Sequence, residues 1–265
     1  MNKMNHIKYA WHRFPFWMSW ISVIIGIVAI IPFPDQWSIF VPIGIVTICF
    51  LSAFIIPFCG SFLKKEYSIA TIGKSSISLR FGSIFDQDCF VVTTNRNFDI
   101  TPDDHYISRT SLLAKFIDTY YPNNVSSLIS EITTQLGTNT DGTIKPQQYG
   151  KTIQINKDSK IIYLMAFTDR KKSNQPDDFY IKAIRGFLKE ISNSNHGRTI
   201  CVPLFGSNNS LSDSGFANNA VALESIVTMI KLFEIENQRS ELKIQIVVLP
   251  ETRSEIIDII AKLSK

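Results

Sequence analysis

Hydrophobic positions divide the chain into two regions with different patterns. Between Arg13 and Lys64 the only acidic or basic side chain is Asp35. This region holds two uncharged runs, 14–33 and 37–58, separated by a short proline-rich turn. At ~1.5 Å per residue, each run is long enough to cross the ~30 Å hydrocarbon layer of a bilayer as a helix. The pattern predicts a two-helix transmembrane hairpin over residues 1–63.

Basic residues flank this expected hairpin on the same side. Lys3, Lys8 and Arg13 precede the first run, and Lys64 and Lys65 follow the second, whereas the turn carries only Asp35. Positive charges favour the cytoplasmic side, so we expect a multi-pass protein with cytoplasmic N- and C-termini. A signal peptide is disfavoured because no clear small-residue cleavage site is present and a second run follows. A buried core hairpin is disfavoured by the length of both uncharged runs.

The pattern changes after Lys65, where short apolar runs alternate with helical periodicity. Residues 64–76 are expected to form a polar connector, and residues 77–265 a separate α/β domain with a mostly parallel sheet. The expected strands are 77–81, 90–94, 152–155, 161–167, 198–204 and 244–249. Helices are expected from Ser111 and over 125–136, 179–191, 216–236 and 253–263.

Two of these segments carry more specific expectations. Residues 90–94, with the sequence FVVTT, are β-branched or apolar throughout and predict a fully buried central strand. In the helix over 179–191, Ile181, Ile184, Leu188 and Ile191 are expected to form one apolar stripe.

Charge and composition exclude several classes of function. The net charge of +4 is divided evenly between residues 1–63 and the remainder, without a basic stripe, which gives no support for nucleic-acid binding. Cys49, Cys59, Cys89 and Cys201 form no C-x-x-C motif, and the four histidines form no metal-ligand cluster. We therefore expect neither a metal nor, in a reducing compartment, a disulfide.

Two loops lie where a parallel α/β sheet binds its ligands, beyond the carboxyl ends of the strands. One begins at Asn95 after FVVTT. The other, 205–210, is rich in Gly, Ser and Asn and precedes a helix. Its backbone N–H groups and the helix N-terminus suit an anion such as a diphosphate. Turn and capping chemistry is the more common reason for such a composition, and no lysine stands where a Walker A motif needs it.

Six short motifs, taken in order, resemble a known family. They are Gly82-Ser83-Ile84-Phe85, Asn95-Arg96-Asn97-Phe98-Asp99, Ser111-Leu112-Leu113-Ala114-Lys115-Phe116-Ile117, Tyr149-Gly150-Lys151-Thr152-Ile153, Ala166-Phe167-Thr168 and Pro203-Leu204-Phe205-Gly206-Ser207. The set is similar to a macro domain, specifically the divergent branch found in membrane-anchored effectors of type II Thoeris antiphage defence. The resemblance implies a macro-like three-layer α/β/α domain after the transmembrane hairpin.

The resemblance also implies a function. A partner TIR-domain enzyme would make an ADP-ribose-derived signal, histidine-ADP-ribose in the type II systems, and the macro domain would bind it. Hairpins of several copies, in contact with lipid, would then disrupt the bacterial inner (cell) membrane and abort infection. This implies a homo-oligomeric sensor without cofactor or catalytic residues. The alternatives are a membrane-tethered ADP-ribosyl hydrolase and an ADP-ribose-binding scaffold.

By the same resemblance, Asn95 would contact a ribose, residues 206–210 would cradle the diphosphate, and Ser111 and Leu112 would border the phosphates. The full set of implied ligand-binding residues is Ile84, Asn95, Asp99, Ser111, Leu112, Phe205, Gly206, Ser207, Asn208, Asn209 and Ser210. The structural alternative for Asn95 is a loop cap after its strand, and for Asp99 a cap or turn residue.

The chain departs from the family pattern in three places. Ser83 replaces the acid that ordinarily reads the adenine amino group, which leaves Asp86, Asp88 or backbone atoms as the alternatives. Asn208 stands where many macro domains have the second glycine of the phosphate loop; asparagine tolerates a left-handed turn, but its side chain opposes the close backbone approach that glycine allows. Ala114 replaces a glycine, a milder change.

Overall fold

The computed structural model describes residues 66–100, 108–140, 142–170, 176–194, 197–206, 218–237 and 241–263. All of them belong to the unit Glu66–Lys265, one of two into which the chain divides. The hairpin expected over residues 1–63 lies outside the described residues. Within the described ranges, every helix is too short or too polar to cross a bilayer.

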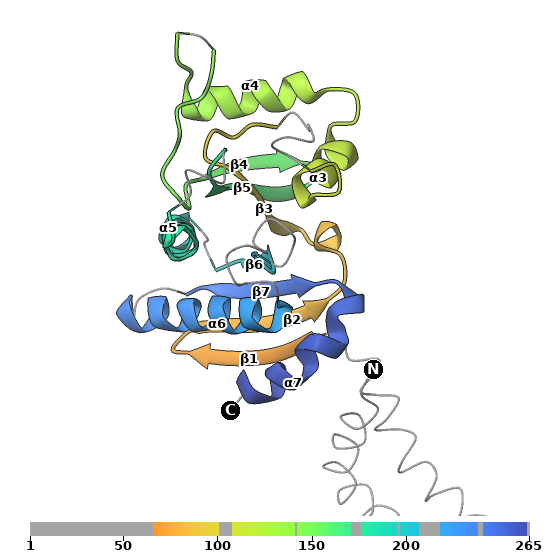
Figure 1. Cartoon of the computed structure of the whole chain (residues 1–265), viewed down its shortest axis with the longest axis vertical. Coiled ribbons are helices and arrows are strands. Elements are labelled where there is room, and N and C mark those ends of the chain that lie inside the picture. Colours follow the sequence, from red (N-terminus) through yellow and green to blue (C-terminus); the bar gives the residue numbers. More distant parts are fainter. Residues whose placement is uncertain are drawn as a thin grey trace, which may run out of the picture. The chain divides into compact units, whose positions relative to one another are not determined.

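The described residues form a sheet with helices on both of its faces (Figure 1). The strands are β1 (Glu66–Ile72), β2 (Ser75–Phe81), β3 (Cys89–Asn95), β4 (Thr152–Lys157), β5 (Lys160–Thr168), β6 (Thr199–Pro203) and β7 (Lys243–Val248). The helices are α3 (Leu112–Tyr120), α4 (Val125–Leu136), α5 (Phe179–Ser194), α6 (Asn219–Glu236) and α7 (Arg253–Leu263), with short 3-10 turns η1 (Ile84–Asp86) and η4 (Pro250–Thr252).

The sheet has seven strands in the order β1-β2-β7-β6-β3-β5-β4. The strands from β2 to β5 in this order pair in parallel, whereas the edge strands β1 and β4 are antiparallel to their neighbours. The sheet is therefore mixed, with a parallel centre, in agreement with the mostly parallel α/β sheet expected from the sequence. Because the central strands share one direction, their carboxyl ends lie along one edge, which we call the carboxyl edge.

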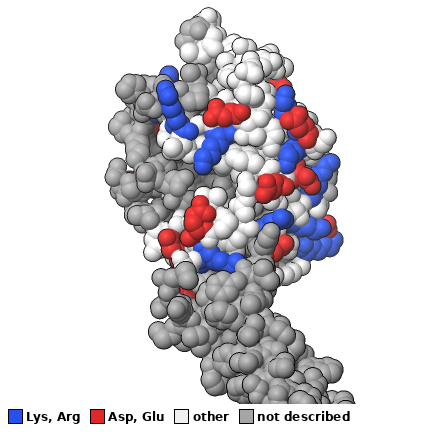
Figure 2. Space-filling view, turned by 90° about the vertical axis from the view of Figure 1, so that its right-hand side faces the viewer, with Lys and Arg blue, Asp and Glu red and all other residues white. Residues whose placement is uncertain are grey.

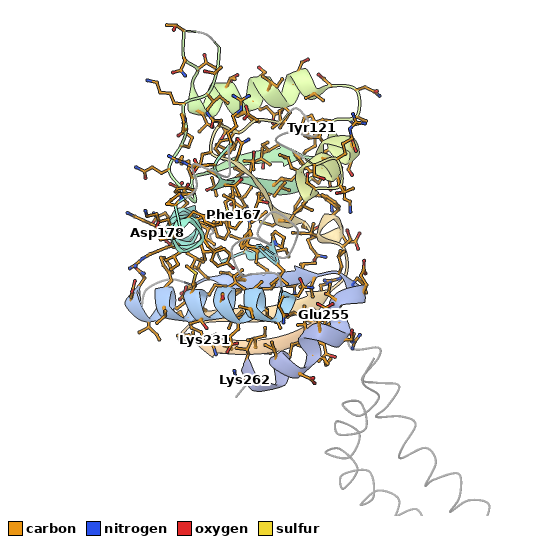
Figure 3. All side chains as sticks on the ribbon, in the orientation of Figure 1. Tyr121, Phe167, Asp178, Lys231, Glu255 and Lys262 are labelled. Carbon is orange, nitrogen blue, oxygen red and sulfur yellow. The ribbon has the colours of Figure 1, made fainter. Side chains whose placement is uncertain are left out.

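Each face of the sheet has its own hydrophobic core. One cluster packs α5, α6 and α7 against the sheet, and the other packs α3 and α4 against the opposite face. Figure 3 shows the difference: Phe167 lies beside α5, and Tyr121 lies beneath α4. In β3, Val91 belongs to the first cluster and Val92 to the second, and both are fully buried. The α/β/α layering and the buried central strand agree with the expectations.

The connector expected over 64–76 is corrected by the structure. Glu66–Ile72 forms the edge strand β1, which pairs with β2 from Glu66 opposite Arg80 to Ile72 opposite Ser75. Its only buried side chain is Ile69, because an antiparallel edge strand shares little of the core. Residues with so weak an apolar signal resemble a polar linker in sequence although their backbone is paired.

The apolar stripe expected in α5 is also partly wrong. Ile181 is 55% exposed, whereas Tyr180, Ala183 and Phe187 are buried with Ile184, Leu188 and Ile191. The buried stripe therefore follows positions 180, 183, 184, 187, 188 and 191, the spacing of a single helix face. Position 181 points away from it because it is one residue, about a quarter of a turn, further along the helix.

The two described cysteines, Cys89 and Cys201, are free and buried. They lie on neighbouring strands but on opposite faces of the sheet, one in each hydrophobic cluster. Burial raises the pKa of the Cys89 thiol to about 11 and that of Cys201 to about 12. Both thiols are therefore protonated and unreactive near neutral pH, because the thiolate is the reactive form.

Iodoacetamide should therefore alkylate Cys89 and Cys201 slowly in the folded protein. At pH 8 a thiol of pKa about 11 has on the order of a hundredfold less thiolate than an unperturbed one. We expect labelling at both positions to be at least about tenfold slower in the native chain than in urea, measured by peptide mass spectrometry. Equal labelling rates in the two conditions would contradict the burial of these thiols.

A close backbone contact joins α5 to the segment before β4. Gly150 has φ +80°, and a Cβ there would lie 2.3 Å from the Phe187 backbone nitrogen. A Cβ on Gly186 would lie 2.3 Å from the Tyr149 carbonyl oxygen. The absence of a side chain at both positions lets the two backbones touch, and the hydrogen bond from Gly150 N to Ala166 O (2.8 Å) ties the segment to β5 as well.

Gly186→Ala tests this contact, because the contact predicts a loss of stability whereas helix propensity predicts a gain. Alanine normally stabilises a helix interior relative to glycine. Here the new methyl group meets backbone that cannot move aside, so we expect a loss of about 1–3 kcal/mol in the free energy of unfolding. The measurement is urea unfolding followed by far-UV circular dichroism.

The matched control is Asn193→Ala, at an exposed position of the same helix. It gains helix propensity without a clash and should not lose stability. Equal stability of the two variants would contradict the close contact between the backbones at Gly186 and Tyr149.

Candidate functional site

The carboxyl edge gathers several of the residues that the sequence singles out. Asn95 ends β3, Phe205 and Gly206 follow β6, and Ile84 follows β2. The parallel pairing of β2 with β7, β7 with β6 and β6 with β3 brings these strand ends to one edge. Gly82 N also donates to Val248 O (2.9 Å), which extends the β2–β7 pairing into the loop before Ile84.

The loop after β3 is closed by the side chain of Asn95. Its Oδ1 accepts hydrogen bonds from the backbone nitrogens of Asn97 (3.0 Å) and Asp99 (3.1 Å), and its Nδ2 donates to Asp99 Oδ2 (3.0 Å). These bonds hold Phe98 at φ +52°, an unusual conformation for an aromatic residue. Asn95, 7% exposed, is thus a loop cap, which is the structural alternative stated for it above.

Two ion pairs connect this loop to the segment after β5. Arg170 Nε lies 3.2 Å from Asp99 Oδ2, and Arg96 Nη1 donates to Asp169 Oδ1 at 3.0 Å. The Arg96–Asp169 pair is mostly shielded, with side chains 26% and 12% exposed. Since shielded pairs are screened less by salt than surface pairs, this pair fixes the two loops more firmly than Arg170 and Asp99 do.

Arg96 also fixes the segment before β4. Its Nε donates to Gln147 O at 2.5 Å, and its guanidinium carbon lies 4.5 Å from the centre of the Tyr149 ring. The Tyr149 hydroxyl donates to Asp169, which already accepts from Arg96. Burial raises the pKa of the Tyr149 hydroxyl to about 12, and the hydrogen bond to Asp169 acts in the same direction. Tyr149 is therefore a neutral donor, not a general base, near pH 7.

The remaining expected residues divide between backbone and packing roles. Ser111 caps α3, because its Oγ accepts from Ala114 N at 3.1 Å, and Leu112 packs partly buried against the α3–α4 core. Phe205 is 2% exposed and its ring stacks on Phe167, with centroids 5.5 Å apart. The Phe205 side chain is therefore part of the core and only its backbone remains for a ligand.

Gly206 directly follows Phe205 and has φ +79°, a left-handed conformation that favours glycine. The turn after β6 therefore begins as the Gly-rich composition predicts. Ser207, Asn208, Asn209 and Ser210 lie outside the described residues, and their role stays a prediction.

The turn η1 at the end of β2 is held from two sides. Ser83 caps it through Oγ, which accepts from Phe85 N at 3.3 Å, and Ile84 is buried. Lys160 Nζ donates to the carbonyl oxygens of Phe85 (2.8 Å) and Gln87 (2.9 Å). The Ser83 hydroxyl is thus engaged in capping, at the position where the family pattern has an acid.

Comparison with known proteins decides the family. The family model described as "Thoeris protein ThsA, Macro domain" matches residues 77–249. The chain belongs to this family.

Solved structures agree with the fold of this ThsA macro domain. Three mutants of the Oceanobacillus iheyensis macrodomain are similar to it with TM-scores of 0.50. The sequence identity to this chain is 13% for an asparagine-to-alanine mutant, 14% for an aspartate-to-alanine mutant and 13% for a glycine-to-valine mutant. The last of these was solved with ADPR. The matches cover 75%, 76% and 75% of this chain and 91%, 98% and 96% of theirs. At such low identity they establish the fold alone. No match was found among the curated proteins.

Sequence reasoning missed the network around Arg96 in the ThsA macro domain. Asp169 and Arg170 follow β5 directly, as Asn95 follows β3, so their position after a parallel strand was the signal that could have found them. Their partners could not be read from the sequence, because an ion pair between loops depends on the fold. Arg96 and Asp169, for example, are 73 residues apart along the chain. No group of three or more His, Cys, Asp or Glu side chains in the described part of the chain could hold a metal ion.

Replacing Asn95 by alanine should destabilise the loop after β3. The change leaves the backbone N–H groups of Asn97 and Asp99 without their acceptor, so we expect a loss of about 1–3 kcal/mol in the free energy of unfolding. Asn97→Ala is the control in the same loop, since it removes a single side-chain bond, to Ile144 O (2.9 Å). Losses of equal size in both variants, measured by urea unfolding, would argue against the capping role.

Proposed function

We propose that this ThsA macro domain is the non-catalytic sensor of a Thoeris system and binds an ADP-ribose derivative at its carboxyl edge. The observation that carries the proposal is the family match over residues 77–249, together with Asn95 and Gly206 at adjacent parallel strand ends. The signal would be histidine-ADP-ribose, made by a partner TIR-domain enzyme. The O. iheyensis macrodomain solved with ADPR supports the same ligand class.

Backbone N–H groups would hold the diphosphate. Gly206, with φ +79°, starts the turn after β6 in a conformation suited to an anion-binding nest. The N-terminus of α3 at Ser111 and Leu112 would add partial positive charge from the other side. Residues 207–210 would complete the cradle.

Asn95 would contact a ribose without giving up its capping role. Its Oδ1 accepts two hydrogen bonds within the loop, and one of the two Nδ2 hydrogens is donated to Asp99. The second Nδ2 hydrogen remains for a ribose hydroxyl. Asp99, bound to both Asn95 and Arg170, would act by holding this amide in place and not by touching the ligand.

Backbone atoms near Ile84 are the favoured readers of the adenine. Ser83 uses its hydroxyl to cap η1, and Asp86 and Asp88 are exposed at the surface. Lys160 fixes the carbonyl groups of η1, so this turn offers a rigid backbone of the kind that reads a base edge without an acidic side chain.

Residues 1–63 would form the effector: a transmembrane hairpin in the bacterial cell membrane with both termini in the cytoplasm. Two helices cannot enclose a pore alone, so membrane disruption would need several copies. The signal can drive such a change only if it binds one conformation or oligomer better than the other. The macro domain would thus convert ligand affinity into a change of assembly.

A pair of substitutions at Gly206 tests the diphosphate site. Asparagine and aspartate are nearly isosteric and both tolerate a left-handed backbone, but only aspartate adds a negative charge. We expect Gly206→Asp to bind histidine-ADP-ribose at least about tenfold more weakly than Gly206→Asn, because the carboxylate repels the phosphates. Calorimetric titration of the full-length chain measures both affinities, and equal affinities would contradict the site.

The same titrations separate a sensor from a hydrolase. The native chain should bind histidine-ADP-ribose saturably, and chromatography after prolonged incubation should recover the ligand unchanged. Release of free ADP-ribose would favour the hydrolase. The absence of binding to either ADP-ribose or its histidine conjugate would contradict the nucleotide function altogether.

A further inference from the structure

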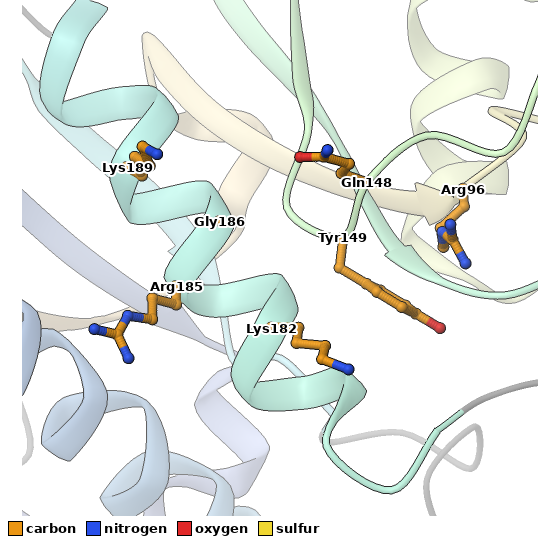
Figure 4. Close-up of a pocket in the computed structure, with 7 residues that line it drawn as sticks. All are labelled: Arg96, Gln148, Tyr149, Lys182, Arg185, Gly186 and Lys189. Atoms are coloured by element: carbon orange, nitrogen blue, oxygen red, sulfur yellow. The ribbon is translucent and has the colours of Figure 1, made fainter.

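A basic cleft lies along α5. It has a volume of about 470 Å³ and is lined by Arg96, Gln148, Tyr149, Lys182, Arg185, Gly186 and Lys189, which we call the α5 cleft. Figure 4 shows the Gln148 amide pointing toward the helix that carries the lysines, whereas the Tyr149 ring extends toward the side of Arg96. The volume is within the range of small-molecule sites in proteins. The lining includes none of the residues assigned above to the nucleotide.

The floor of this cleft is rigid. The backbones of α5 and of residues 149–150 touch at Gly186 and Gly150, where a Cβ on either residue would lie within 2.3 Å of backbone atoms. The Tyr149 ring contacts the guanidinium of Arg96 and lies near the ring of Phe179, whose centroid is 6.4 Å away. A ligand would therefore meet a floor whose backbone does not have to rearrange.

Among the described residues, the lining of the cleft carries four cations and no carboxylate. Lys182, Arg185 and Lys189 have helical spacing that puts them on one face of α5. Arg185 points away from Tyr149 and pairs with Glu236 at 2.5 Å, whereas Lys182 extends on the side of Tyr149 (Figure 4). Lys189 lines the cleft further along the helix. Beyond Lys189 the hollow continues past the Lys151–Glu190 pair.

The charges of these lysines are only partly compensated. Lys182 pairs with Asp178 at 2.9 Å, but both side chains are 53% exposed, so this pair contributes little and can be exchanged for a ligand. Lys189 has no ion-pair partner among the residues described. By contrast, basic and acidic side chains are interspersed on the face shown in Figure 2.

The chemistry of the lining distinguishes among anions. The Tyr149 ring is already engaged within the protein, because the Arg96 guanidinium carbon lies 4.5 Å from its centre and the tilted Phe179 ring lies at a centroid distance of 6.4 Å. The remaining groups are ammonium and amide donors, which suit compact, highly charged oxygen anions. We propose that the α5 cleft is a second ligand site, which binds a phosphate or diphosphate group through Lys182 and Lys189, with Gln148 as a neutral donor.

This site is independent of the proposed nucleotide site but adjoins it through one residue. Arg96 lines the α5 cleft and immediately follows Asn95 at the carboxyl edge. Arg96 itself is already bound to Asp169 and Gln147, so it acts as a fixed wall, and the two lysines are the groups free to move onto a phosphate.

A phosphate group at the cleft has two possible sources, a soluble phosphate compound or the headgroup of an anionic phospholipid. Inorganic pyrophosphate is the soluble probe, and vesicles of phosphatidylcholine with or without phosphatidylglycerol are the lipid probe. Binding of pyrophosphate without binding to either kind of vesicle would indicate a soluble ligand. Stronger binding to the vesicles that contain phosphatidylglycerol than to those without it would indicate the headgroup. Both outcomes support the site, provided that the cleft variant below loses the binding.

The test uses the full-length chain and two double variants of equal charge. Lys182→Gln with Lys189→Gln removes the cleft cations, and Lys74→Gln with Lys262→Gln removes two exposed lysines of surface ion pairs elsewhere. We expect calorimetry at low salt to give pyrophosphate binding at least about tenfold weaker in the cleft variant, and unchanged in the control. Equal weakening in both variants, or no saturable binding of either probe to the native chain, would overturn the proposal.

A second readout keeps this test separate from the proposed function. The cleft variant should keep its urea unfolding midpoint and its affinity for histidine-ADP-ribose, because neither lysine belongs to the nucleotide site. Loss of pyrophosphate binding together with loss of ADP-ribose binding at unchanged stability would mean that the cleft is part of the nucleotide site, and would overturn its independence. Failure of ADP-ribose binding in the native chain would leave the pyrophosphate result interpretable on its own.

Discussion

The burial of β3 on both faces is the constraint from which the architecture follows. A strand with no face open to water must satisfy its backbone groups through neighbours, and β3 does so by parallel pairing with β5 and β6. Parallel neighbours need crossover connections, which supply the helices that cover both faces. The same parallel arrangement brings Asn95, Gly206 and Asp169 to one edge, where polar groups can meet without interrupting either core.

Polar side chains at this edge serve mainly one another. Asn95 holds its own loop, Asp99 joins that loop to Arg170, and Arg96 links Asp169 with the segment before β4. These contacts fix the loops relative to one another, so less conformational entropy would be lost if the proposed nucleotide bound there. The register shift between Thr94 and Asn95 belongs to the same design, because an irregularity at a strand end redirects the chain next to the site.

Much of the fold was predictable from the sequence, since buried strands such as FVVTT and the capped helix at Ser111 carry strong local signals. The edge strand β1 was not, because a single buried side chain, Ile69, leaves its pattern close to that of a linker. The position of Asn95 and Gly206 after parallel strands also followed from the sequence, and their contact with a ligand stays a prediction. The core role of Phe205 and the pairing of Arg96 with Asp169 depend on spatial neighbours, which no local pattern encodes.

The antiparallel pairing of β1 has a geometric consequence for how movement travels through the domain. Glu66, the first residue of β1, lies opposite Arg80, two residues before the loop that leads to η1. The chain therefore enters the sheet at its carboxyl edge, one strand spacing, about 4.8 Å, from the end of β2. A displacement of that loop would therefore act on the pairing of two adjacent strands whose side chains, Ile69 in β1 and Leu79 in β2, belong to the same hydrophobic cluster.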